Sequence, residues 1–564
     1  MNRTVSVIMP AFNEGRCIYD NIRLTCEILA EAGITAEIVA VDDGSSDNTL
    51  AEIERAAQAL ENVRAVRNPY NIGKGMALRS GFEHSTGEIV VFLDADLDLH
   101  PSQIQTLLAV LEEGLYDIVV TSKHHPQSQL DYPLSRKIAS WIYFIFIKTL
   151  FNLPVRDTQT GLKVFRRKVL EDVFHRLLVK KFAYDIELLA AAVRFGYRVK
   201  EVPVILNFKR ELKWGRIRFP DVMSLFIDTL AIFYRLRILH YYDMKRPPLP
   251  VRFPKVLVAI RGCPPSEDVV KRLTFEGNVR IACLSKTGGF GEETGEILFF
   301  HGEESLRNWL KTQGSEVEIV GLLSSECLPL GNWVKNAVRN FQDPGVNAVC
   351  GPVIPGPFST FLERIAGMVF PTLLTRGTDT RLYSYKPMRM TGKGLSDNIF
   401  LRASLFQEKQ AGANSLSWVN SFVYDRNTAG KMRYDPDVAV SKPVPPLFFP
   451  YMRMVFHMAY REGFFFFGRY GSGNRFWEAF PMVMALLIFV GWLTLPTDLY
   501  GGIIALYLCM IIVAGLFTFS LSSAPPVMLG ILCDHAARAA GFTAGMLARV
   551  KERMFATDHA DIRG

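Results

Sequence analysis

Residues 88–96 read EIVVFLDAD, and this stretch decides the fold of the first part of the chain. Its short apolar run is typical of a buried strand. Two acidic side chains, Asp94 and Asp96, follow the run, and a buried strand cannot contain such carboxylates without partners. They therefore belong to a loop at the end of the strand, where they can face a ligand.

The same alternation of short apolar runs and helical stretches extends over residues 5–201. The predicted strands contain VSVIMP, EIVAVDD, VRAVRN and EIVVFLDAD, and the predicted helices cover residues 17–32, 49–60, 75–84 and 101–113. This pattern predicts βαβ units and a mostly parallel sheet with helices on both faces. Because ligands of such sheets bind at the carboxyl ends of the strands, the chemistry is expected at that edge.

Polar clusters also follow two other predicted strands. The first is Pro10-Ala-Phe-Asn13-Glu14, and the second is DDGSSD at residues 42–47. Carboxylate and amide side chains at strand ends can accept hydrogen bonds from a nucleobase edge and from ribose hydroxyls, and small residues allow a tight turn near the ligand. Taken alone, DDGSSD is also typical of a turn that caps a helix.

Asp94 and Asp96 are separated by one residue, and two such carboxylates at a strand end can hold a hard divalent cation. The predicted cofactor is Mg²⁺ or Mn²⁺, which would bind a diphosphate group and neutralise its charge. An isolated pair of this kind is more often a surface feature. The interpretation as a metal site therefore depends on the neighbouring motifs.

In chain order the sequence contains PxxNE, DDGSxD, RNxxNxGKG at residues 67–75, and DAD. This succession resembles the family 2 glycosyltransferases, which implies a GT-A (Rossmann-like) fold that binds a nucleotide sugar. RDTQTGLKVF at residues 156–165 and FAYDIELL at residues 182–189 are similar to the dolichyl-phosphate glucosyltransferases and other polyprenyl-phosphate sugar synthases. The resemblance implies an inverting transfer of a hexose to a polyprenyl phosphate, whose ionised oxygen needs positioning but no strong general base.

The resemblance also implies roles for single residues. The predicted nucleotide-sugar contacts are Pro10, Asn13, Glu14, Asp43, Asp47, Lys74, Asp94 and Arg216. The predicted catalytic residues are Asp96, Asp157 and Gln159, the predicted metal ligands are Asp94 and Asp96, and the predicted acceptor-phosphate contacts are Lys123, Arg136 and Ser140. Asp185 and Glu187 are expected to orient basic residues. Arg216 belongs to KRELKWGRIRF, which lacks the Gly-x-Ser-Lys ending of related synthases, so only its positive charge is carried over.

An acceptor site for a lipid phosphate should be basic and lie beside an apolar surface. Residues 135–151, SRKIASWIYFIFIKTLF, combine two adjacent cations with an aromatic run on which an isoprenoid could lie. A core helix with a capped start is the alternative. Residues 220–242 are predicted to lie on a membrane surface, with a buried helix as the alternative.

Two apolar stretches near the end of the chain predict an integral membrane protein, in agreement with a mean hydropathy of +0.14. Residues 480–496 and 499–521 lack Lys and Arg and are predicted as transmembrane helices, the first only just long enough. Basic residues flank the pair but not its connection, which predicts a hairpin with both flanks in the cytoplasm. Residues 525–548 are predicted as an interfacial helix, with a third span as the alternative.

Composition narrows the partners and the compartment. The net charge of +8 is modest for 564 residues and no long basic run is present, which argues against nucleic acid. The eight cysteines form no CxxC pair, so neither a zinc site nor a disulfide framework is expected. The N-terminus lacks the pattern of a signal peptide. Soluble domains on the cytoplasmic side of the membrane are expected, and a homo-oligomer is left open.

The later part of the chain resembles a second, degenerate family 2 domain. Residues 318–355 have the rhythm of the family's DxD strand, its helix and the following strand, but Ser324-Ser325-Glu326 stands in place of DxD. Trp418-Val-Asn-Ser421 replaces an acidic pair of such enzymes. The hypothesis is a pseudo-transferase that serves as scaffold, dimerisation surface or acceptor channel. A second active transferase with an unusual site is the alternative.

These predictions divide the chain into five regions. They are a catalytic GT-A domain at residues 1–219, an interface helix and linker at 220–254, a degenerate GT-A-like α/β domain at 255–475, two transmembrane helices at 476–524, and an interfacial helix with a cytoplasmic tail at 525–564. The favoured donor is UDP-glucose, while GDP-mannose and a nucleotide-linked N-acetylhexosamine stay open.

Two other functions compete with transfer to a polyprenyl phosphate. One is a transferase that extends a membrane-associated glycan, with a sugar hydroxyl as acceptor and Asp157 or Asp185 as base. The other is a nucleotide-sugar-binding membrane scaffold without turnover. A requirement for a lipid phosphate would distinguish the first, and an activity assay the second.

Overall fold

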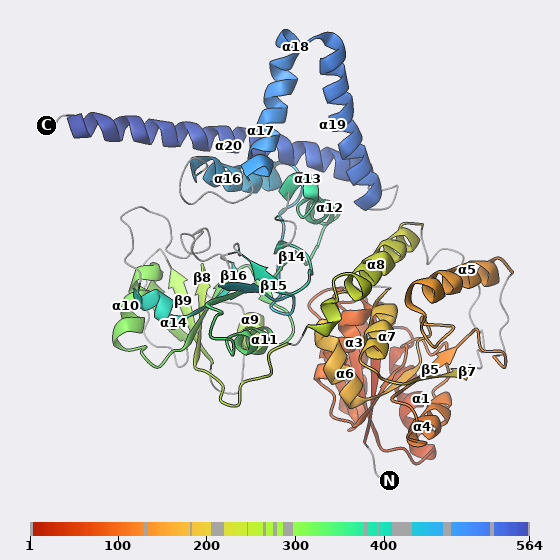
Figure 1. Ribbon diagram of the computed structural model, residues 1–564. Coiled ribbons are helices and arrows are strands. Elements are labelled where there is room, and N and C mark those ends of the chain that lie inside the picture. The colour runs from red at the N-terminus through yellow and green to blue at the C-terminus, as the bar shows by residue number, and fades with distance from the viewer. Residues whose placement is uncertain are drawn as a thin grey trace. The chain divides into compact units, whose positions relative to one another are not determined.

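The computed structural model contains two compact units, residues Met1–Lys245 and Arg246–Gly564 (Figure 1). The structure describes residues 4–128, 134–180, 183–204, 219–244, 246–262, 267–273, 279–285, 297–376, 379, 382–391, 394–395, 397–408, 431–465, 475–518 and 524–561. Each unit has its own sheets and its own core.

The first unit is built on one seven-stranded sheet. Its strands are β1 (Val5–Ala11), β2 (Ala36–Asp42), β3 (Val63–Arg67), β4 (Ile89–Phe92), β5 (Ile118–Ser122), β6 (Lys163–Arg166) and β7 (Val199–Pro203). Their order is β3-β2-β1-β4-β6-β5-β7, with β6 antiparallel to β4 and β5 and the other neighbours parallel. The helices are α1 (Ile18–Glu31), α2 (Thr49–Ala59), α3 (Lys74–Glu83), α4 (Gln103–Glu112), α5 (Leu134–Phe151), α6 (Arg167–Val173), α7 (Tyr184–Arg194) and α8 (Phe219–Arg237).

Consecutive residues are buried in the centre of this sheet. Val7, Ile8 and Met9 of β1 are all fully buried. Since successive side chains of a strand point to opposite faces, burial of all three requires cover on both faces. The predicted α/β fold with a mostly parallel sheet is confirmed for this unit.

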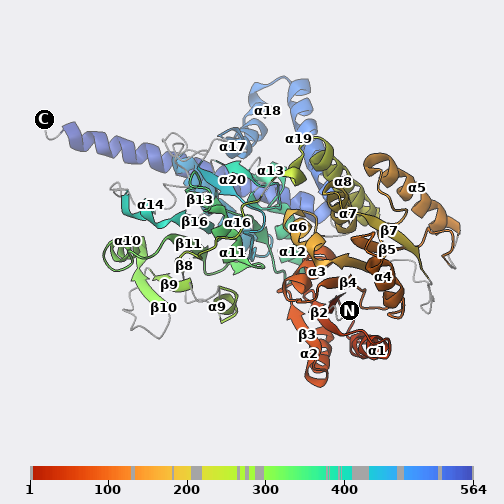
Figure 2. The ribbon, with the colours of Figure 1, turned by 60° about the horizontal axis from the view of Figure 1, so that its bottom comes forward.

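α5 and α8 expose aromatic side chains and lie side by side in both views (Figure 1 and Figure 2). Phe146 of α5 stacks on Phe226 of α8, with ring centroids 5.1 Å apart. Trp141 on α5 is 59% exposed, and Tyr234 on α8 is 47% exposed. Both helices therefore keep an open aromatic side, which is more typical of a helix on an apolar partner than of a buried helix.

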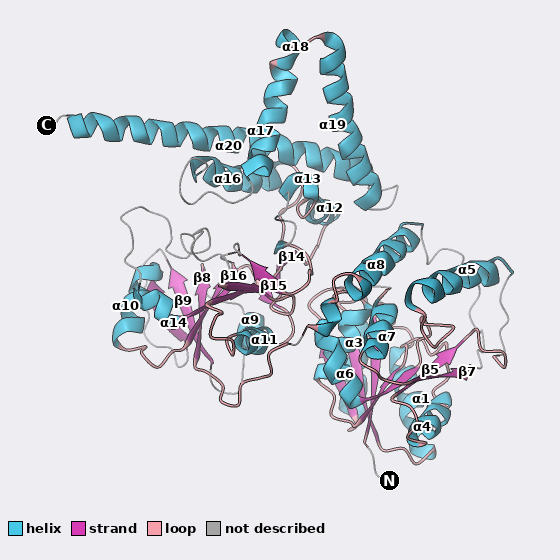
Figure 3. Cartoon of the chain, viewed as in Figure 1, coloured by secondary structure: helices cyan, strands magenta, loops and turns pink. Residues whose placement is uncertain are grey.

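The second unit has an eight-stranded sheet of order β10-β9-β8-β11-β16-β13-β17-β15 and a three-stranded sheet of order β12-β18-β14 (Figure 3). The strands are β8 (Val256–Arg261), β9 (Val279–Ser285), β10 (Ile297–His301), β11 (Ile319–Ser324), β12 (Leu328–Pro329), β13 (Ala348–Cys350), β14 (Val353–Pro355), β15 (Arg389–Thr391), β16 (Asn398–Arg402), β17 (Met432–Tyr434) and β18 (Val440–Lys442). The helices around them are α9 (Glu267–Leu273), α10 (Gly302–Thr312), α11 (Trp333–Asn340), α12 (Phe361–Val369), α13 (Leu373–Arg376) and α14 (Ala403–Glu408).

Seven strands of the larger sheet repeat the strand order of the first unit. In chain order β8, β9, β10, β11, β13, β16 and β17 take the places of β1 to β7, and all six pairings between neighbours have the same direction. Arg166 at the end of β6 and Arg402 at the end of β16 each donate hydrogen bonds to main-chain carbonyl oxygens at or after the end of a preceding helix. The two units therefore share one topology.

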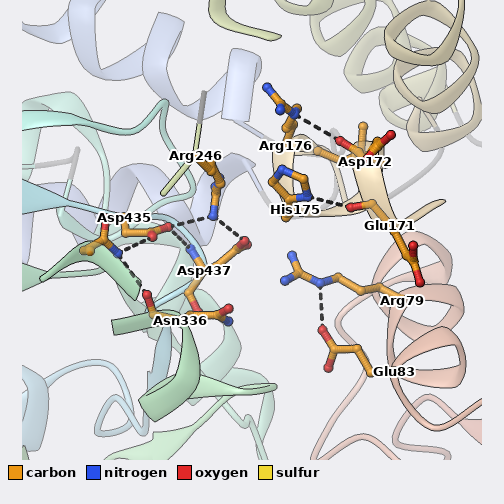
Figure 4. A network of polar contacts seen from close by, with 12 residues as sticks. Arg79, Glu83, Glu171, Asp172, His175, Arg176, Arg246, Asn336, Asp435 and Asp437 are labelled. Atoms are coloured by element: carbon orange, nitrogen blue, oxygen red, sulfur yellow. Dashed lines mark hydrogen bonds and ion pairs between the residues drawn. The ribbon is translucent and has the colours of Figure 1, made fainter. Parts of the chain in front are cut away.

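Arg246 anchors the start of the second unit by buried ion pairs (Figure 4). Its Nη1 donates to Asp437 Oδ2 at 2.7 Å and to Asp435 Oδ1 at 3.2 Å. Asn340 Nδ2 donates to the other oxygen of Asp435 at 2.8 Å. These contacts fix the backbone where the chain enters this unit.

A group of helices completes the second unit. They are α16 (Phe449–Phe465), α17 (Arg475–Phe489), α18 (Gly491–Thr494), α19 (Thr497–Thr518) and α20 (Ala524–Asp561). α17 and α19 are the arms of a hairpin, and α20 runs across its base (Figure 1). Glycines allow α16 and α20 to pack closely. A Cβ on Gly463 would lie 2.1 Å from the carbonyl oxygen of Phe542, and a Cβ on Gly541 would lie 2.3 Å from the carbonyl oxygen of Phe456.

Among the described residues, one helix is long and apolar enough to cross a membrane, namely α19 with its window Thr497–Ala514. The apolar part of α17 covers only Ala479–Phe489. The predicted pair of spans is thus reduced to one candidate of full length. Residues 525–548, predicted as an interfacial helix before a tail, belong to one continuous helix of 38 residues.

Candidate active site

The sheet of the first unit brings the sequence motifs to one edge. β6 runs against its neighbours, so that Lys163 at its start pairs with Phe92 at the end of β4. The residues at this edge are Ala11 at the end of β1, Asp42 at the end of β2, Phe92 at the end of β4, Ser122 at the end of β5 and Lys163 at the start of β6. This is the carboxyl edge at which ligands of such sheets bind.

The loops that follow β1 and β2 are joined by hydrogen bonds. Asn13 adopts a positive φ of 56°, and its Oδ1 accepts a hydrogen bond from the Ser46 backbone N–H at 2.9 Å. The Asn13 backbone N–H donates to Ser45 Oγ at 2.9 Å, and that of Glu14 donates to Thr49 Oγ1 at 2.8 Å. PxxNE and DDGSSD therefore form one structural element, in which Asn13 links the two loops by hydrogen bonds.

Asp47 braces this element from within. Its carboxylate accepts hydrogen bonds from the backbone N–H of Gly15 at 3.1 Å and of Thr49 at 3.0 Å. Slight burial alone would raise the pKa of Asp47, but these hydrogen bonds outweigh it and hold the pKa below its ordinary value. Contact of Asp47 with a nucleoside stays a prediction.

Asp43 is buried and supports the loop before α3. Its carboxylate accepts hydrogen bonds from Asn68 Nδ2 at 2.7 Å and from the Gly73 backbone N–H at 2.9 Å. Burial raises the pKa of Asp43 against the opposing effect of these bonds. The residue thereby positions the start of α3, where Lys74 lies, and its predicted contact with the nucleoside is likewise untested.

Lys74 is held against the DxD motif. Its Nζ lies 2.5 Å from Asp94 Oδ1, and the two side chains are 37% and 39% exposed. Burial opposes the charge on both groups, but Lys74 lowers the pKa of Asp94 below its ordinary value, and Asp94 raises the pKa of Lys74, with a further contribution from Asp185. A partly exposed ion pair of this kind can exchange partners when a charged ligand arrives.

Gly161 lies directly against Asp94 and was not singled out in the sequence. A Cβ at this position would lie 2.0 Å from Asp94 Oδ2, so only glycine leaves the carboxylate in its place. Asn21 supports the same loop, because its Nδ2 donates to the carbonyl oxygen of Ala95 at 2.7 Å. The one available signal for Gly161 was its position as the last residue of DTQTG, just before a strand.

The DTQTG segment contacts the end of β5. Asp157 Oδ2 accepts a hydrogen bond from the Lys123 backbone N–H at 3.2 Å, and its Oδ1 accepts one from the Gln159 backbone N–H at 2.9 Å. Gln159 Nε2 is buried and has no hydrogen-bond partner among the described residues. A buried amide donor without a partner is costly, so this group is available to an oxygen of a bound ligand.

A buried ion pair lies under this loop. Lys163 Nζ is 2.6 Å from Asp185 Oδ1, and the side chains are 1% and 7% exposed. The same Nζ contacts the carbonyl oxygen of Thr160, which ties the pair to DTQTG. Glu187, two residues further along α7, accepts from Arg235 Nη2 at 2.9 Å. Both acids thus contact basic side chains, whereas Lys163 was missed because its partner is distant in sequence.

Several predicted site residues cannot be placed. The side chains of Arg136 and Ser140 on α5 lie outside the described part, and so does the whole of Arg216. Pro10 lies within β1, where it pairs with Val41 of β2.

Asp94 and Asp96 fit a magnesium-like ion as far as the described residues show. No group of three or more potential metal ligands occurs among them. Mg²⁺ needs only one or two carboxylates when phosphate oxygens and waters complete its coordination. The two aspartates at the strand end therefore match a cation that binds together with a diphosphate.

The register of the second sheet identifies the counterpart of this motif. β11 and β16 pair as β4 and β6 do, and Leu322 takes the place of Phe92 when both are counted from the arginine that ends the partner strand. Two residues further on, Ser324-Ser325-Glu326 takes the place of Asp94-Ala95-Asp96.

The counterpart site contains ion pairs within the chain. Lys442 Nζ lies 2.7 Å from Asp397 Oδ2 and 3.4 Å from Glu326 Oε2. Arg261 Nη2 lies 3.4 Å from the other oxygen of Asp397. By the same register, Asp397 takes the place of Gly161. The acids of this edge are thus already matched by cations of the chain.

Comparisons with known proteins cover the first unit. The sequence profile described as Glycosyl transferase family 2 matches residues 6–174. The chain is 30% identical over 237 residues to the glycosyltransferase AglD of Haloferax volcanii, which covers 42% of this chain and 38% of that protein. It therefore spans well under half the length of AglD.

Two further proteins are similar over the same region. A crystal structure of glucosyl-3-phosphoglycerate synthase from Mycobacterium tuberculosis with Mn²⁺, UDP-glucose and phosphoglyceric acid is 19% identical, with a TM-score of 0.32 over 41% of this chain and 79% of that one. The dolichyl-phosphate beta-glucosyltransferase ALG5D of Trichomonas vaginalis is 31% identical over 257 residues, which cover 43% of this chain and 77% of that protein. This relationship, together with the profile, shows that the chain belongs to glycosyl transferase family 2.

Proposed function

We propose that the chain transfers a hexose, with UDP-glucose as the favoured donor, to the phosphate of a polyprenyl carrier with inversion at the anomeric carbon. The observation that carries this proposal is the convergence of Asp94, Lys74, Asp157 and Gln159 at one sheet edge. The similarity of the chain to a dolichyl-phosphate glucosyltransferase supports a polyprenyl phosphate as the acceptor.

The donor would bind through its diphosphate beside Asp94 and Asp96. A bound Mg²⁺ or Mn²⁺ would supply positive charge for the leaving nucleoside diphosphate. Lys74 would add a second positive charge, since its ammonium already lies at this position against Asp94. The unpartnered Gln159 Nε2 would donate to a hydroxyl of the transferred sugar.

The acceptor would approach from the side of Lys123, which follows β5 and whose charge lowers the pKa of Asp94 after those of Lys74 and Lys163. Arg136 and Ser140 are proposed to contact the same phosphate. The exposed aromatic side of α5 and α8 would accommodate the isoprenoid, and its surface favours a position at the membrane.

The contacts of the two candidate bases favour a phosphate acceptor over a sugar hydroxyl. A hydroxyl needs a general base, and both oxygens of Asp157 already accept hydrogen bonds from backbone N–H groups. Asp185 is buried against Lys163. These contacts give both carboxylates a structural role, whereas a phosphate brings its own negative oxygen.

The hairpin of α17 and α19 is proposed to embed in the cytoplasmic membrane, with the soluble domains on the cytoplasmic side. Leu486 and Phe489 on α17 are 61% and 77% exposed, and Leu493 on α18 is 74% exposed. Leu506 on the second arm is 65% exposed. Apolar side chains of this exposure are stable in lipid but not in water.

The second sheet unit is proposed to be a degenerate GT-A domain without transferase activity. Its strand order matches that of the first unit, but Ser324-Ser325-Glu326 and the Lys442–Asp397 pair replace the DxD site. A role as scaffold, dimerisation surface or acceptor channel fits a domain that keeps its fold without its ligands. Tight Mn²⁺ binding that survives removal of Asp94 and Asp96 would contradict this assignment.

The test is transfer of radiolabelled sugar by the full-length protein in detergent with Mn²⁺. UDP-glucose, GDP-mannose and UDP-N-acetylglucosamine are offered in turn, with undecaprenyl phosphate, with a glycan acceptor, or with neither. The proposal expects a lipid-extractable product from one donor and only with the lipid phosphate. A product on the glycan alone would support the alternative in which a sugar hydroxyl is the acceptor. No product with any donor would support the alternative of a nucleotide-sugar-binding scaffold without turnover.

A further inference from the structure

Glu187 on α7 is a fully buried carboxylate that binds three other segments of the first unit. Its Oε2 accepts hydrogen bonds from the backbone N–H groups of Leu178 at 2.9 Å and Val179 at 2.7 Å, in the loop before α7. Its Oε1 accepts from Arg235 Nη2 at 2.9 Å, near the end of α8, and from the hydroxyl of Tyr242 at 2.5 Å, in the short turn that follows α8. One carboxylate therefore ties this loop to α8.

The loop that Glu187 holds also contacts the start of α3. The carbonyl oxygen of Lys180 accepts a hydrogen bond from the Gly75 backbone N–H at 3.1 Å. The ring of Tyr184, on the first turn of α7, packs against the same glycine, since a Cβ on Gly75 would lie 2.4 Å from Tyr184 Cδ2. Gly75 directly follows Lys74, the proposed contact of the donor diphosphate. The backbone beside Lys74 is thus held by the loop and by α7.

α8 has one buried and one open side. The large apolar side chains of the open side are 40% to 47% exposed and follow each other at helical spacing, namely Phe226, Ile227, Leu230 and Tyr234. Arg235 lies on the other side of the helix, with its side chain 12% exposed, and Ile232 on that side is fully buried. An isoprenoid on the open side would therefore hold α8 in the position from which Arg235 contacts Glu187.

The first turn of α7 joins the two sides of the proposed site. α7 packs against both α3 and α8 (Figure 1). Asp185 and Glu187 leave this turn in nearly opposite directions, because two residues rotate a helix by about 200°. Asp185 binds Lys163 under the DTQTG segment, whereas Glu187 binds α8. A buried carboxylate that loses its partners is costly, so α8 cannot move away without a change in α7 or in the loop before it.

We infer that Glu187 is a positioning residue, through which an isoprenoid bound on α8 strengthens the binding of the donor diphosphate at Lys74. This inference rests on the proposed function, which supplies both ligands. The isoprenoid keeps Arg235 on Glu187, and Glu187 keeps the loop against Gly75, so both ligands favour the same arrangement of the loop. Because coupling between two binding equilibria is reciprocal, the donor nucleotide also strengthens the binding of the isoprenoid.

The experiment measures nucleotide binding to the full-length protein in detergent by isothermal titration calorimetry. UDP, and GDP in parallel, are titrated with Mn²⁺ in the presence and absence of undecaprenol. This lipid has the isoprenoid but no phosphate, so it permits no transfer and brings no negative charge to the site. The variants are Arg235→Met and Glu187→Gln/Arg235→Met, and the matched control is Glu171→Gln, which removes an exposed carboxylate of α6.

In the wild type and in Glu171→Gln, undecaprenol should lower the Kd of the nucleotide about tenfold, a common size for coupling between two sites. In both Arg235 variants the Kd should be the same with and without the lipid. The double variant leaves no buried charge without its partner, so its unfolding midpoint should stay close to that of the wild type. Loss of the lipid effect in a stable protein separates positioning from a purely structural role.

A tenfold effect that persists in the double variant, or a wild type that binds the nucleotide equally well with and without undecaprenol, overturns the coupling and leaves the proposed transferase intact. A wild type that binds neither UDP nor GDP contradicts the proposed function and the inference with it. Should the double variant not fold, Arg235→Lys decides, because lysine keeps the charge but lacks the guanidinium fork. Its lipid effect should be smaller than that of the wild type, and an equal effect overturns the inference.

Discussion

The two sheet units share one strand order but differ at the same edge. In the first unit this edge carries Asp94 and Asp96, with Lys74 as a partly exposed counterion. In the second unit serines and Glu326 stand at the same register, and Lys442 is paired with Asp397. The comparison teaches that the buried ladders preserve the topology, whereas the chemistry depends on a few residues beyond the strand ends.

A second difference lies inside the sheets. Lys163 of the first unit is a buried cation paired with Asp185, and Ile399 takes its place in the second unit. An isoleucine is the less costly choice for a sheet interior, since a buried ion pair must overcome the desolvation of two charges. The Lys163–Asp185 pair is therefore present in the unit whose DTQTG loop we propose to bind the donor sugar.

The largest expected effect comes from giving the first unit the residue of the second. Lys163→Ile leaves Asp185 buried without its partner, and breaking such a pair costs about 3 to 5 kcal/mol in the free energy of unfolding. The double variant Lys163→Ile/Asp185→Leu should recover most of this loss. Calorimetry of the full-length variants checks the prediction, and a single variant as stable as the wild type would show that the pair is not structural.

The next effect compares the two lysines that face the two edges. Lys74→Met removes a positive charge from the proposed diphosphate site, and kcat/KM for transfer should fall on the order of 100-fold. Lys442→Met removes a cation at the edge of the second unit and should leave kcat/KM within about twofold. Steady-state assays of both variants are the measurement. Equal losses would mean that both edges take part in transfer.

A smaller effect is expected for Gly161→Ala. The added methyl would lie 2.0 Å from Asp94 Oδ2, so the carboxylate must move by a fraction of the contact distance. Such misplacement should reduce kcat/KM about tenfold with little change in the unfolding midpoint. Gly501→Ala on α19 has nothing within 4 Å and serves as the control. Full activity of Gly161→Ala would remove Asp94 from the proposed mechanism.

The smallest expected effect is the low reactivity of the Cys327 thiol at the edge of the second sheet. Cys327 follows Glu326, and burial, with Asp397 and Glu326 adding to it, raises the pKa of its thiol to about 12. Because the thiolate is the nucleophile, alkylation by iodoacetamide should be absent at pH 8 and increase only as the pH approaches that value. Mass spectrometry gives the extent of modification, with the unfolded protein as the positive control. Rapid labelling of the folded protein at pH 8 would show that this edge opens.

Periodicity and strand-end acids were sufficient to predict the first sheet and to place Asp94 and Asp96 at its edge. The sequence could not distinguish a residue that contacts a ligand from one that supports a loop. It does not show that backbone N–H groups donate hydrogen bonds to the carboxylates of Asp43 and Asp47. Gly161 and Lys163 were missed for a related reason. Their partners, Asp94 and Asp185, are 67 and 22 residues away and meet them only through the fold.

The second unit and the hairpin show the same limits. The replacement of DxD by Ser324-Ser325-Glu326 was visible in the sequence, and the strand register places it as expected. The Asp397–Lys442 ion pair at this edge was not visible, since Lys442 lies on β18 and Asp397 directly before β16. The first predicted span, residues 480–496, stays a prediction, and an apolar run alone does not show that its helix ends at Phe489.

The most direct test measures lipid-linked product from a matched pair of variants. Asp96→Asn removes a carboxylate from the proposed metal site of the first unit, and Glu326→Gln removes the corresponding one from the second. The account predicts that Asp96→Asn abolishes transfer to undecaprenyl phosphate and that Glu326→Gln keeps the wild-type rate. Retained transfer in Asp96→Asn, or its loss in Glu326→Gln, would contradict the division of labour between the two units.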